Sequence, residues 1–193
     1  MVTLYYHVDT TRFATDRKTQ EPPAVIRVAW WRDDEPQPVC MLVQPPVGAT
    51  MDQAAFRYHG IELKDAVAIG KRPDHVAQLF ADAATMIDAA VAFNAPFHKR
   101  NIERLTSIPT DEPFFVTQCA MEAAAPILCL PPTRGTGWKS PSLVECCNLF
   151  DVPYPLAPDD EGSADPVERG KSVIRAVRGV WEAVQRANAP EAA

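Results

Sequence analysis

The N-terminal part of the chain is organised as short β-like runs separated by polar turns. Residues 3 to 9 alternate in part between apolar and polar side chains, as a half-buried strand would. Residues 25 to 31 are rich in β-branched and aromatic side chains, and residues 38 to 43 can pair with them across the polar turn at 32 to 35. This pattern predicts three antiparallel strands at the start of the chain.

Beyond these strands the apolar residues change to helical spacing. They recur at three- and four-residue intervals from Pro73 onward, and again in the amphipathic C-terminal segment. The other expected features are a short buried strand at 91–93, a helix opened by Pro96, a short strand at 114–116, a helix start at 140–143 and fraying after Ala187. Antiparallel strands followed by alternating helices and short strands indicate a mixed α/β sheet with helices on both faces.

The composition is that of an ordinary globular domain. With 193 residues, 47% hydrophobic and 23% charged, the chain can bury one sizeable core. We therefore expect a single domain over residues 1–187 and a frayed tail over 188–193. No apolar run reaches the ~18 residues of a membrane span, and no secretory signal is visible. The five cysteines lack zinc-like spacing, which favours reduced thiols in a cytoplasmic protein.

The net charge limits the ways in which the chain can hold nucleic acid. It is -6, with an isoelectric point near 5.2. Proteins that grip long nucleic acids through phosphate contacts are usually basic. Any contact with nucleic acid is therefore expected to be local, through a metal ion or a small basic patch.

Three polar motifs carry the candidate chemistry. They are Asp9-Thr10-Thr11 after the first strand, Asn94 to His98 after a later strand, and Asp160 to Asp165 before the last helix. His59-Gly60-Ile61 lies between the first two, and residues 137–143 precede the third. In this order and spacing the motifs resemble those of the DnaQ-like 3'-5' exonucleases, also called the DEDD family. The resemblance covers most of the chain and implies an RNase H-like α/β fold, in which three antiparallel strands precede parallel ones.

Enzymes of this family hold two divalent cations with four carboxylates. By resemblance, Asp9 and Asp165 match two of these carboxylates, whereas Thr11 and His98 stand at the other two. Asp160 stands where the family has its general-base histidine, and an aspartate of pKa ~3.9 is a weaker base than a histidine of ~6.5. The resemblance therefore implies a degenerate active site, in which Mg²⁺ or Mn²⁺ binds weakly or not at all.

The resemblance also implies a pocket for the 3' terminal nucleotide of a single strand. The residues that would line it are Thr10, Thr11, His59, Asn94 and Phe97. A rebuilt site is a second hypothesis, with Asp9, His98 and Asp165 holding one metal ion. Imidazole suits Mn²⁺ or Zn²⁺ better than Mg²⁺.

Each candidate also has an ordinary structural interpretation. Asp165, which precedes Pro166, is a favourable helix N-cap. His98 could be a half-buried helix residue without a ligand, and His59 could be a turn residue. Asp160 could belong to a solvated acidic loop.

The leading hypothesis is a catalytically impaired exonuclease homologue that binds a nucleotide or the 3' end of a single strand. One alternative is a slow or metal-shifted 3'-5' exonuclease. Another is a protein-interaction subunit that kept only the fold, with a partner in replication, repair or defence. The sequence leaves open whether the chain is an enzyme and whether it forms a homodimer, as several exonucleases of this fold do.

Overall fold

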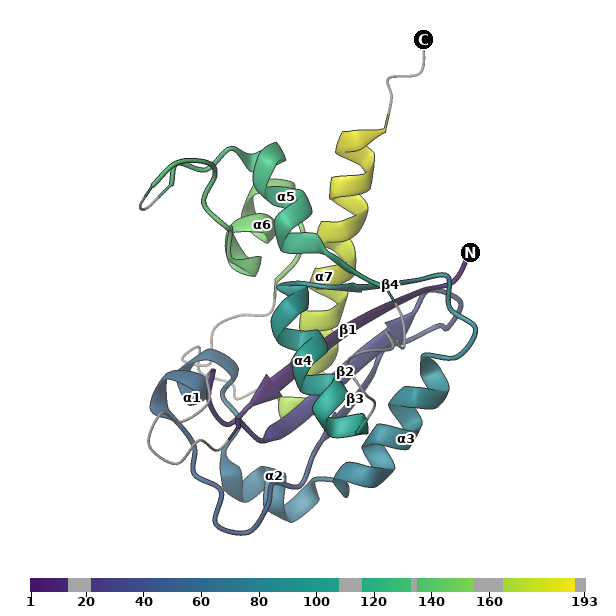
Figure 1. Ribbon diagram of the computed structural model, residues 1–193, viewed down its shortest axis with the longest axis vertical. Coiled ribbons are helices and arrows are strands. Elements are labelled where there is room, and N and C mark those ends of the chain that lie inside the picture. The colour runs from purple at the N-terminus through teal and green to yellow at the C-terminus, as the bar shows by residue number, and fades with distance from the viewer. Residues whose placement is uncertain (14–21, 108–115, 133–134, 155–164, 190–193) are drawn as a thin grey trace.

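The structure, a computed structural model, describes residues 1–13, 22–107, 116–132, 135–154 and 165–189 (Figure 1). Its strands are β1 (Thr3–Thr10), β2 (Val25–Arg32), β3 (Val39–Leu42), β4 (Ala89–Ala92) and β5 (Thr117–Cys119). Its helices are α1 (Gln53–His59), α2 (Leu63–Ile69), α3 (Pro73–Ala83), α4 (Ala95–Thr106), α5 (Ala120–Leu128), α6 (Leu143–Phe150) and α7 (Pro166–Asn188).

The five strands form one mixed sheet in the order β3-β2-β1-β4-β5. β1 pairs antiparallel with β2, and β2 pairs antiparallel with β3. On its other side β1 pairs parallel with β4, which pairs parallel with β5. This arrangement confirms the predicted sheet, in which three antiparallel strands are followed by parallel ones.

Helices cover both faces of the sheet. α3 and α4 pack on one face, and α7 crosses the other, where α5 and α6 lie against it (Figure 1). Side chains of β1 alternate between the layers because successive strand residues point to opposite faces. Tyr6 and Val8 join the core beneath α3 and α4, whereas Tyr5 joins the core beneath α7. His7 and Asp9 lie two and four positions after Tyr5, so their side chains point to the same face of the sheet as that of Tyr5.

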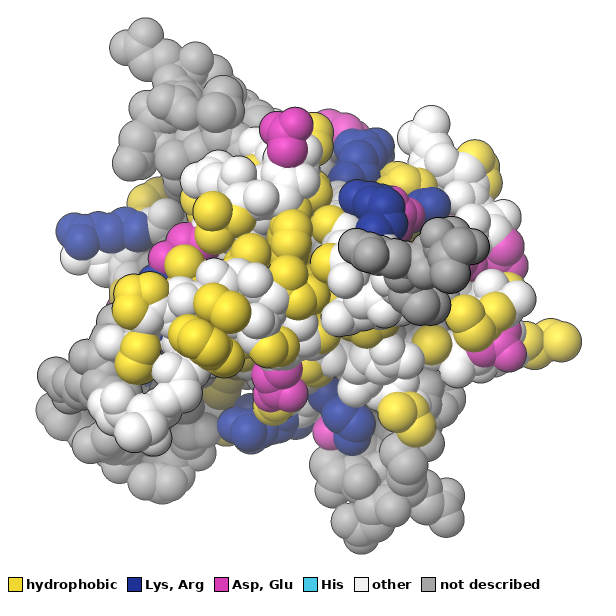
Figure 2. Space-filling view, turned by 90° about the horizontal axis from the view of Figure 1, so that it is seen from above, with side chains coloured by type: hydrophobic (Ala, Val, Ile, Leu, Met, Phe, Trp, Pro, Cys, Tyr) yellow, Lys and Arg dark blue, Asp and Glu magenta, His cyan; other side chains and the backbone are white. Residues whose placement is uncertain are grey.

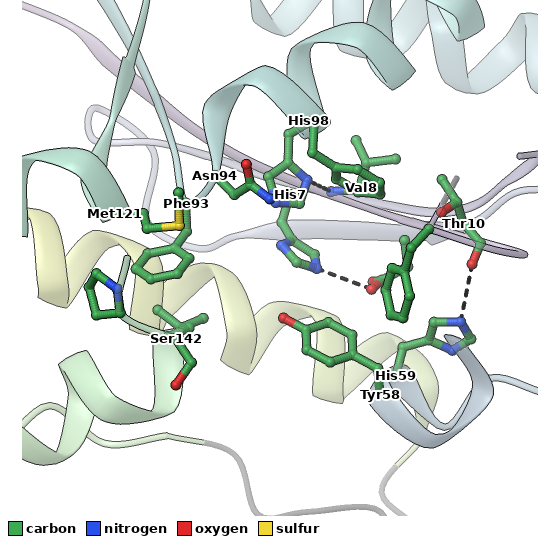
Figure 3. Close-up of a pocket in the computed structure, with 15 residues that line it drawn as sticks. His7, Val8, Thr10, Tyr58, His59, Phe93, Asn94, His98, Met121 and Ser142 are labelled. Atoms are coloured by element: carbon green, nitrogen blue, oxygen red, sulfur yellow. Dashed lines mark hydrogen bonds and ion pairs between the residues drawn. The ribbon is translucent and has the colours of Figure 1, made fainter. Parts of the chain in front are cut away.

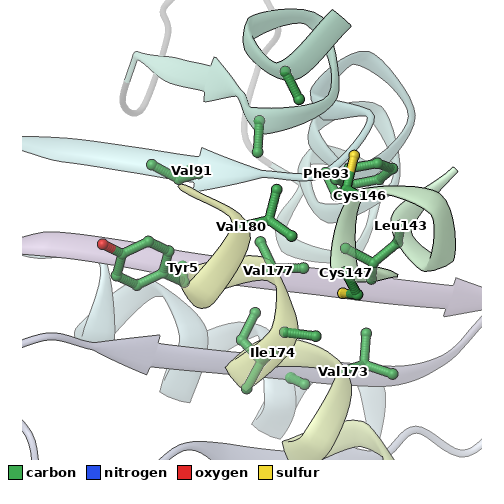
Figure 4. Close-up of a cluster of buried hydrophobic side chains, with 14 of the residues drawn as sticks. Tyr5, Val91, Phe93, Leu143, Cys146, Cys147, Val173, Ile174, Val177 and Val180 are labelled. Carbon is green, nitrogen blue, oxygen red and sulfur yellow. The ribbon is translucent and has the colours of Figure 1, made fainter. Parts of the chain in front are cut away.

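Helix α7 supplies much of the second core. Val173, Ile174, Val177 and Val180 point from α7 toward the sheet and toward Cys147 of α6 (Figure 4). These positions follow the apolar stripe that the sequence predicted for a C-terminal amphipathic helix. Burial of each such side chain contributes about 1.5–3 kcal/mol, so the stripe fixes α7 across the sheet.

Local capping signals place several helix starts where the sequence predicted them. α3 begins at Pro73, and Pro96 lies in the first turn of α4. α6 begins with a capping box in which Ser142 and Glu145 exchange side-chain and backbone hydrogen bonds. These three predictions are confirmed.

Other elements differ from the prediction. Helices α1, α2 and α5 were not predicted from the sequence. The expected strand at 114–116 is displaced, since β5 begins at Thr117 and Val116 is an exposed residue before it. Residues 114 and 115 lie outside the described part of the chain. α7 runs to Asn188, one residue beyond Ala187, after which fraying was expected.

Two observations on the described residues concern contacts with membranes and with nucleic acids. No helix among the described residues is long and apolar enough to cross a membrane. The end of the molecule in Figure 2 mixes apolar side chains with small groups of charged ones, and among the side chains described there, Lys and Arg form no continuous band.

Candidate functional site

A cavity of about 430 Å³ opens at the carboxyl ends of the parallel strands β1 and β4. Its wall combines the end of β1 with residues of α1, the start of α4 and the start of α6. Tyr58, Phe93 and His98 belong to this wall (Figure 3). The cavity therefore lies among three motifs identified in the sequence, those of Asp9, His59 and Asn94.

The geometry of β1 explains why His7 and Asp9 both reach this cavity. All eight residues of β1 are buried, and the two side chains share one face because they are two positions apart. The pairing with β2 shifts between Asp9 and Thr10, which marks a β-bulge. Such bulges redirect the strand locally. Here the bulge ends the regular ladder directly after Asp9.

Asp9 is buried and fully engaged. Its side chain is 3% exposed, and Arg27 Nε and Nη2 each lie 2.7 Å from its Oδ2. Its Oδ1 lies 3.2 Å from Nε2 of His7. Burial alone would raise the pKa of Asp9, but Arg27, followed by His7, holds it well below its usual range. Asp9 is therefore an ionised carboxylate with a partner on each oxygen.

Arg27 lies directly opposite Asp9 on β2 and is 1% exposed. Its Nη1 donates a hydrogen bond of 2.7 Å to the carbonyl of Pro166, the first residue of α7. A buried charge is costly unless it is paired and hydrogen-bonded. Here the guanidinium meets both conditions, because it contacts a carboxylate and a backbone carbonyl together.

Thr10 and Thr11 hold the loop after β1 in place. Thr10 donates its hydroxyl to the carbonyl of Arg12 at 2.6 Å. Thr11 is 2% exposed, and its hydroxyl accepts from the backbone N–H of Ala24 at 3.1 Å. The side chain of Thr11 is therefore committed to the link with the segment before β2. Thr10 lines the cavity, whereas Thr11 does not belong to its wall.

His59, at the end of α1, has backbone partners on both ring nitrogens. Nδ1 accepts from the N–H of Ile61 at 3.0 Å, and Nε2 donates to the carbonyl of Thr10 at 3.3 Å. Burial lowers the pKa of His59. The neutral ring therefore connects the end of α1 to the end of β1 through its hydrogen bonds. It also forms part of the cavity wall.

His98, on α4, is held in a similar way. Its Nδ1 accepts from the backbone N–H of Val8 at 3.1 Å, so this nitrogen carries no proton. Burial, followed by the nearby His7 ring, lowers the pKa of His98 well below its usual range. The two imidazole rings lie with their centroids 4.5 Å apart. His98 therefore acts as a neutral link between α4 and β1.

His7 differs from the other two histidines because one of its nitrogens is unused. Its Nε2 faces Asp9, and an ionised carboxylate only accepts, so Nε2 carries the proton. Its Nδ1 is buried and has no hydrogen-bond partner among the described residues. Because the His7 ring belongs to the cavity wall, this nitrogen is a candidate contact for a bound molecule (Figure 3).

Aromatic residues form other parts of the wall. Phe97 of α4 is half-buried and stands edge-on to His98, with ring centroids 5.2 Å apart. Phe13 meets Tyr58 of α1 in a T-shaped pair at 5.6 Å. The hydroxyl of Tyr58 points into the cavity (Figure 3). Asn94 adopts the left-handed conformation that asparagine tolerates, with φ of 60°, and turns the chain from β4 into α4.

The third motif contributes less to the described site. Asp165 is an exposed N-cap of α7, and its Oδ1 accepts from the N–H of Val167 at 2.9 Å. It is not part of the cavity wall. Asp160, the predicted base, lies outside the described residues.

The described donor set does not fit a divalent cation. Mg²⁺ prefers several oxygen ligands, mostly carboxylates, in a near-octahedral shell. Asp9 is already paired with Arg27, His98 already accepts from Val8, and Asp165 caps a helix. Within the described ranges, no group of three or more His, Cys, Asp or Glu side chains is placed to hold a metal ion.

Solved structures share this architecture, whereas no family model and no curated protein matches the sequence. A product-bound exonuclease I matches 96% of the chain with a TM-score of 0.68 at 14% identity. Escherichia coli exonuclease I in complex with a dT13 oligonucleotide matches 97% with a TM-score of 0.67 at 13% identity. The Methylocaldum szegediense exonuclease I matches 94% with a TM-score of 0.60 at 14% identity.

The fold is the RNase H-like fold of exonuclease I. This confirms the fold that the three sequence motifs predicted. The chain spans less than half of those proteins, since the matches cover 43%, 41% and 42% of the exonuclease I chains, respectively. At such low identity the likeness establishes the fold and leaves the activity to be argued from the site.

Two residues of the site were missed by sequence reasoning. Arg27 lies between apolar residues in the buried part of β2, and a charged residue at such a position needs a buried partner. His7 stands two positions before Asp9, on the same strand face. Both signals were present in the sequence, but only the three-dimensional pairing shows what the side chains contact.

Proposed function

We propose that this chain is a catalytically impaired exonuclease homologue, which binds the 3' end of a single strand, or a nucleotide, in the cavity. One observation carries the proposal. Asp9 is the only acid in the described cavity wall, and Arg27 already neutralises it. The cavity thus offers a neutral surface of aromatic and histidine rings.

The size and lining of the cavity suit a flat heterocycle. Small-molecule sites are commonly ~300–1,000 Å³ and mostly apolar, with a few placed polar groups. This cavity, at about 430 Å³, lies within that range. Stacking of a base on an aromatic side chain is worth about 1–3 kcal/mol, and the rings of Phe97 and Tyr58 are placed in the wall.

Polar groups of the cavity can orient such a ligand. His7 Nδ1 is an unused acceptor, so it can receive a hydrogen bond from an amino or hydroxyl group. The Tyr58 hydroxyl points into the same space (Figure 3).

The same features argue against fast hydrolysis. Two-metal phosphoryl hydrolysis needs carboxylates that are free to hold cations. The described carboxylate closest to this role, Asp9, is committed to Arg27. Loss of one member of a catalytic unit already removes most of the rate.

Two solved neighbours support the choice of ligand class. One is an Escherichia coli exonuclease I complex with a dT13 oligonucleotide, and the other is a zinc-bound complex of the same enzyme with single-stranded DNA. For the present chain, binding of single-stranded nucleic acid is our proposal. Its protein partners, its homodimerisation and its cytoplasmic location remain predictions, and the free cysteines are compatible with the last of these.

The test is fluorescence anisotropy of short 5'-labelled DNA and RNA strands at low salt with EDTA. We expect saturable binding that weakens when the 3' end carries a phosphate. Phe97→Ala should weaken binding about five- to 150-fold, because stacking is lost. Leu149→Ala is the matched control, since Leu149 is exposed on α6 and outside the cavity wall. Indifference to both nucleic acids would contradict the proposal.

A digestion assay separates binding from slow catalysis. The same strands are incubated with Mg²⁺ or Mn²⁺, with Asp9→Ala as the control for contaminating nucleases. We expect no nucleotide release beyond that of the control. Release that disappears in the Asp9→Ala protein would establish the slow, metal-shifted exonuclease instead. Absence of nucleic-acid binding together with a co-purifying protein would favour the interaction subunit.

A further inference from the structure

The pairing of Asp9 with Arg27 is unusual because both side chains are almost completely buried. Arginine is rarely buried to this degree without a partner. Two guanidinium nitrogens lie 2.7 Å from the same carboxylate oxygen, and His7 engages the other oxygen. A cation that approached Asp9 would have to displace one of these donors.

Arg27 also connects the two elements that the family resemblance assigns to metal binding. Asp9 lies on β1, and Asp165 directly precedes α7. The guanidinium reaches Asp9 with two nitrogens and the carbonyl of Pro166, the first residue of α7, with the third. The side chain therefore joins the end of β1 to the start of α7 with a fixed positive charge.

Helix α7 leaves room for the Arg27 side chain at Gly170. Gly170 lies within the helix, where glycine is unfavourable relative to alanine. A Cβ atom there would lie 3.0 Å from Cδ and 3.2 Å from Nε of Arg27. It would also overlap Sγ of Cys40, so the glycine leaves space for both Cys40 and Arg27 beneath α7.

We infer that the guanidinium of Arg27 takes the place of a divalent cation between β1 and α7, so that this site is closed to metal ions. The cation is part of the chain, and the site keeps its charge balance when Mg²⁺ or Mn²⁺ is absent. This inference concerns the cation position alone and holds whatever molecule fills the cavity.

The experiment measures Mn²⁺ binding and thermal unfolding of the full chain. Free Mn²⁺ is followed by electron paramagnetic resonance for the wild-type protein and for Asp9→Asn. We expect the two proteins to take up Mn²⁺ equally weakly, because Asp9 is occupied. Uptake at least tenfold tighter in the wild-type protein than in Asp9→Asn would overturn the inference.

The arginine itself is tested with Arg27→Met, which leaves Asp9 without its partner. We expect Mn²⁺ to raise the unfolding midpoint of Arg27→Met, and to leave that of Arg27→Met/Asp9→Asn unchanged. Arg72→Met is the matched control, since Arg72 forms a two-nitrogen pair with Asp74 at an exposed position. A folded Arg27→Met protein that is indifferent to Mn²⁺ would contradict the inference. If Arg27→Met does not fold, the comparison of Mn²⁺ uptake by the wild-type protein and Asp9→Asn still tests the inference.

Discussion

Arg27 and Asp9 stand directly opposite each other in the β1–β2 ladder, with Nε and Nη2 of the arginine each 2.7 Å from Oδ2 of the aspartate. Direct cross-strand neighbours are the closest side-chain pairs that a sheet offers. This pair is buried on both sides. Its charges therefore interact with little screening by water, and their loss should lower the free energy of unfolding of the whole domain.

The first prediction concerns stability. Arg27→Met should lower the free energy of unfolding by about 3–5 kcal/mol, because it leaves the buried carboxylate of Asp9 uncompensated. The control is Arg72→Met, which breaks an exposed pair that also uses Nε and Nη2 of the arginine, and which should change stability little. Urea unfolding at neutral pH, followed by circular dichroism, gives both values.

A double variant separates the loss of the pair from the exposure of one charge. Arg27→Met/Asp9→Asn removes both charges, and should be more stable than Arg27→Met alone. The reason is that a buried pair contributes little net stability, whereas a single buried charge is strongly unfavourable. Equal losses in Arg27→Met and Arg72→Met would show that the burial of the pair has no energetic consequence.

The second prediction concerns pH. The pKa values of His98 and His59 are lowered in the fold, mainly by burial, while His7 and Asp9 face His98 with opposing effects. In the unfolded chain both histidines titrate near 6.5. Below that pH the unfolded chain binds protons that the folded chain does not. The stabilisation present above pH ~6.5 should therefore decline as the pH falls through the lowered values.

Urea unfolding between pH 7.5 and pH 5 tests this dependence. His98→Asn should reduce the slope, because asparagine does not titrate and its Oδ1 can accept from the N–H of Val8. His75→Asn is the control, since His75 is exposed on α3. A slope that stays the same in His98→Asn would show that His98 does not link protonation to folding.

The third prediction concerns thiol reactivity. Burial raises the pKa of Cys40 and Cys146 to about 12, and that of Cys147 to about 11. The thiolate is the reactive form, so these three thiols should label slowly with iodoacetamide at pH 8. Cys129 is exposed and should label first. Peptide mass spectrometry over time measures the order, and early labelling of Cys40 would contradict its burial.

The fold was largely predictable because its signals are local. The alternation in β1 and β2, the capping box of Ser142 and Glu145, and the apolar stripe of α7 each depend on neighbours a few residues apart. β5 was placed too early because only three residues form it, and its pairing with β4 is non-local. α5 was missed because Pro126 lies inside it and because its nearly all-apolar sequence shows no contrast between an apolar and a polar face.

The site was less predictable than the fold. The sequence located Asp9, His59 and His98 in neighbouring motifs, and the structure brings these residues together around the cavity. Their hydrogen-bond partners could not be read from spacing, because Val8, Thr10 and Arg27 are brought to them by the sheet and its bulge. A motif fixes where a side chain lies, but not whether its polar atoms are already occupied.

The last prediction concerns Gly170, where helix propensity and packing oppose each other. Alanine is favoured over glycine within a helix by about 1 kcal/mol, so propensity alone would make Gly170→Ala stabilising. The new Cβ, however, would overlap Sγ of Cys40 and would lie 3.0 Å from Cδ of Arg27. Overpacking of this kind costs about 1–3 kcal/mol, and we expect it to outweigh the propensity.

Cys40→Ala separates the two contacts. It removes the sulfur atom, so Gly170→Ala should cost less in the Cys40→Ala background than in the wild-type background, as a double-mutant cycle by urea unfolding would measure. The loss of stability that Gly170→Ala still causes in the Cys40→Ala background measures the contact with Arg27. If Gly170→Ala instead stabilises the wild-type protein, α7 has room above Arg27, and the glycine is not needed to seat the guanidinium.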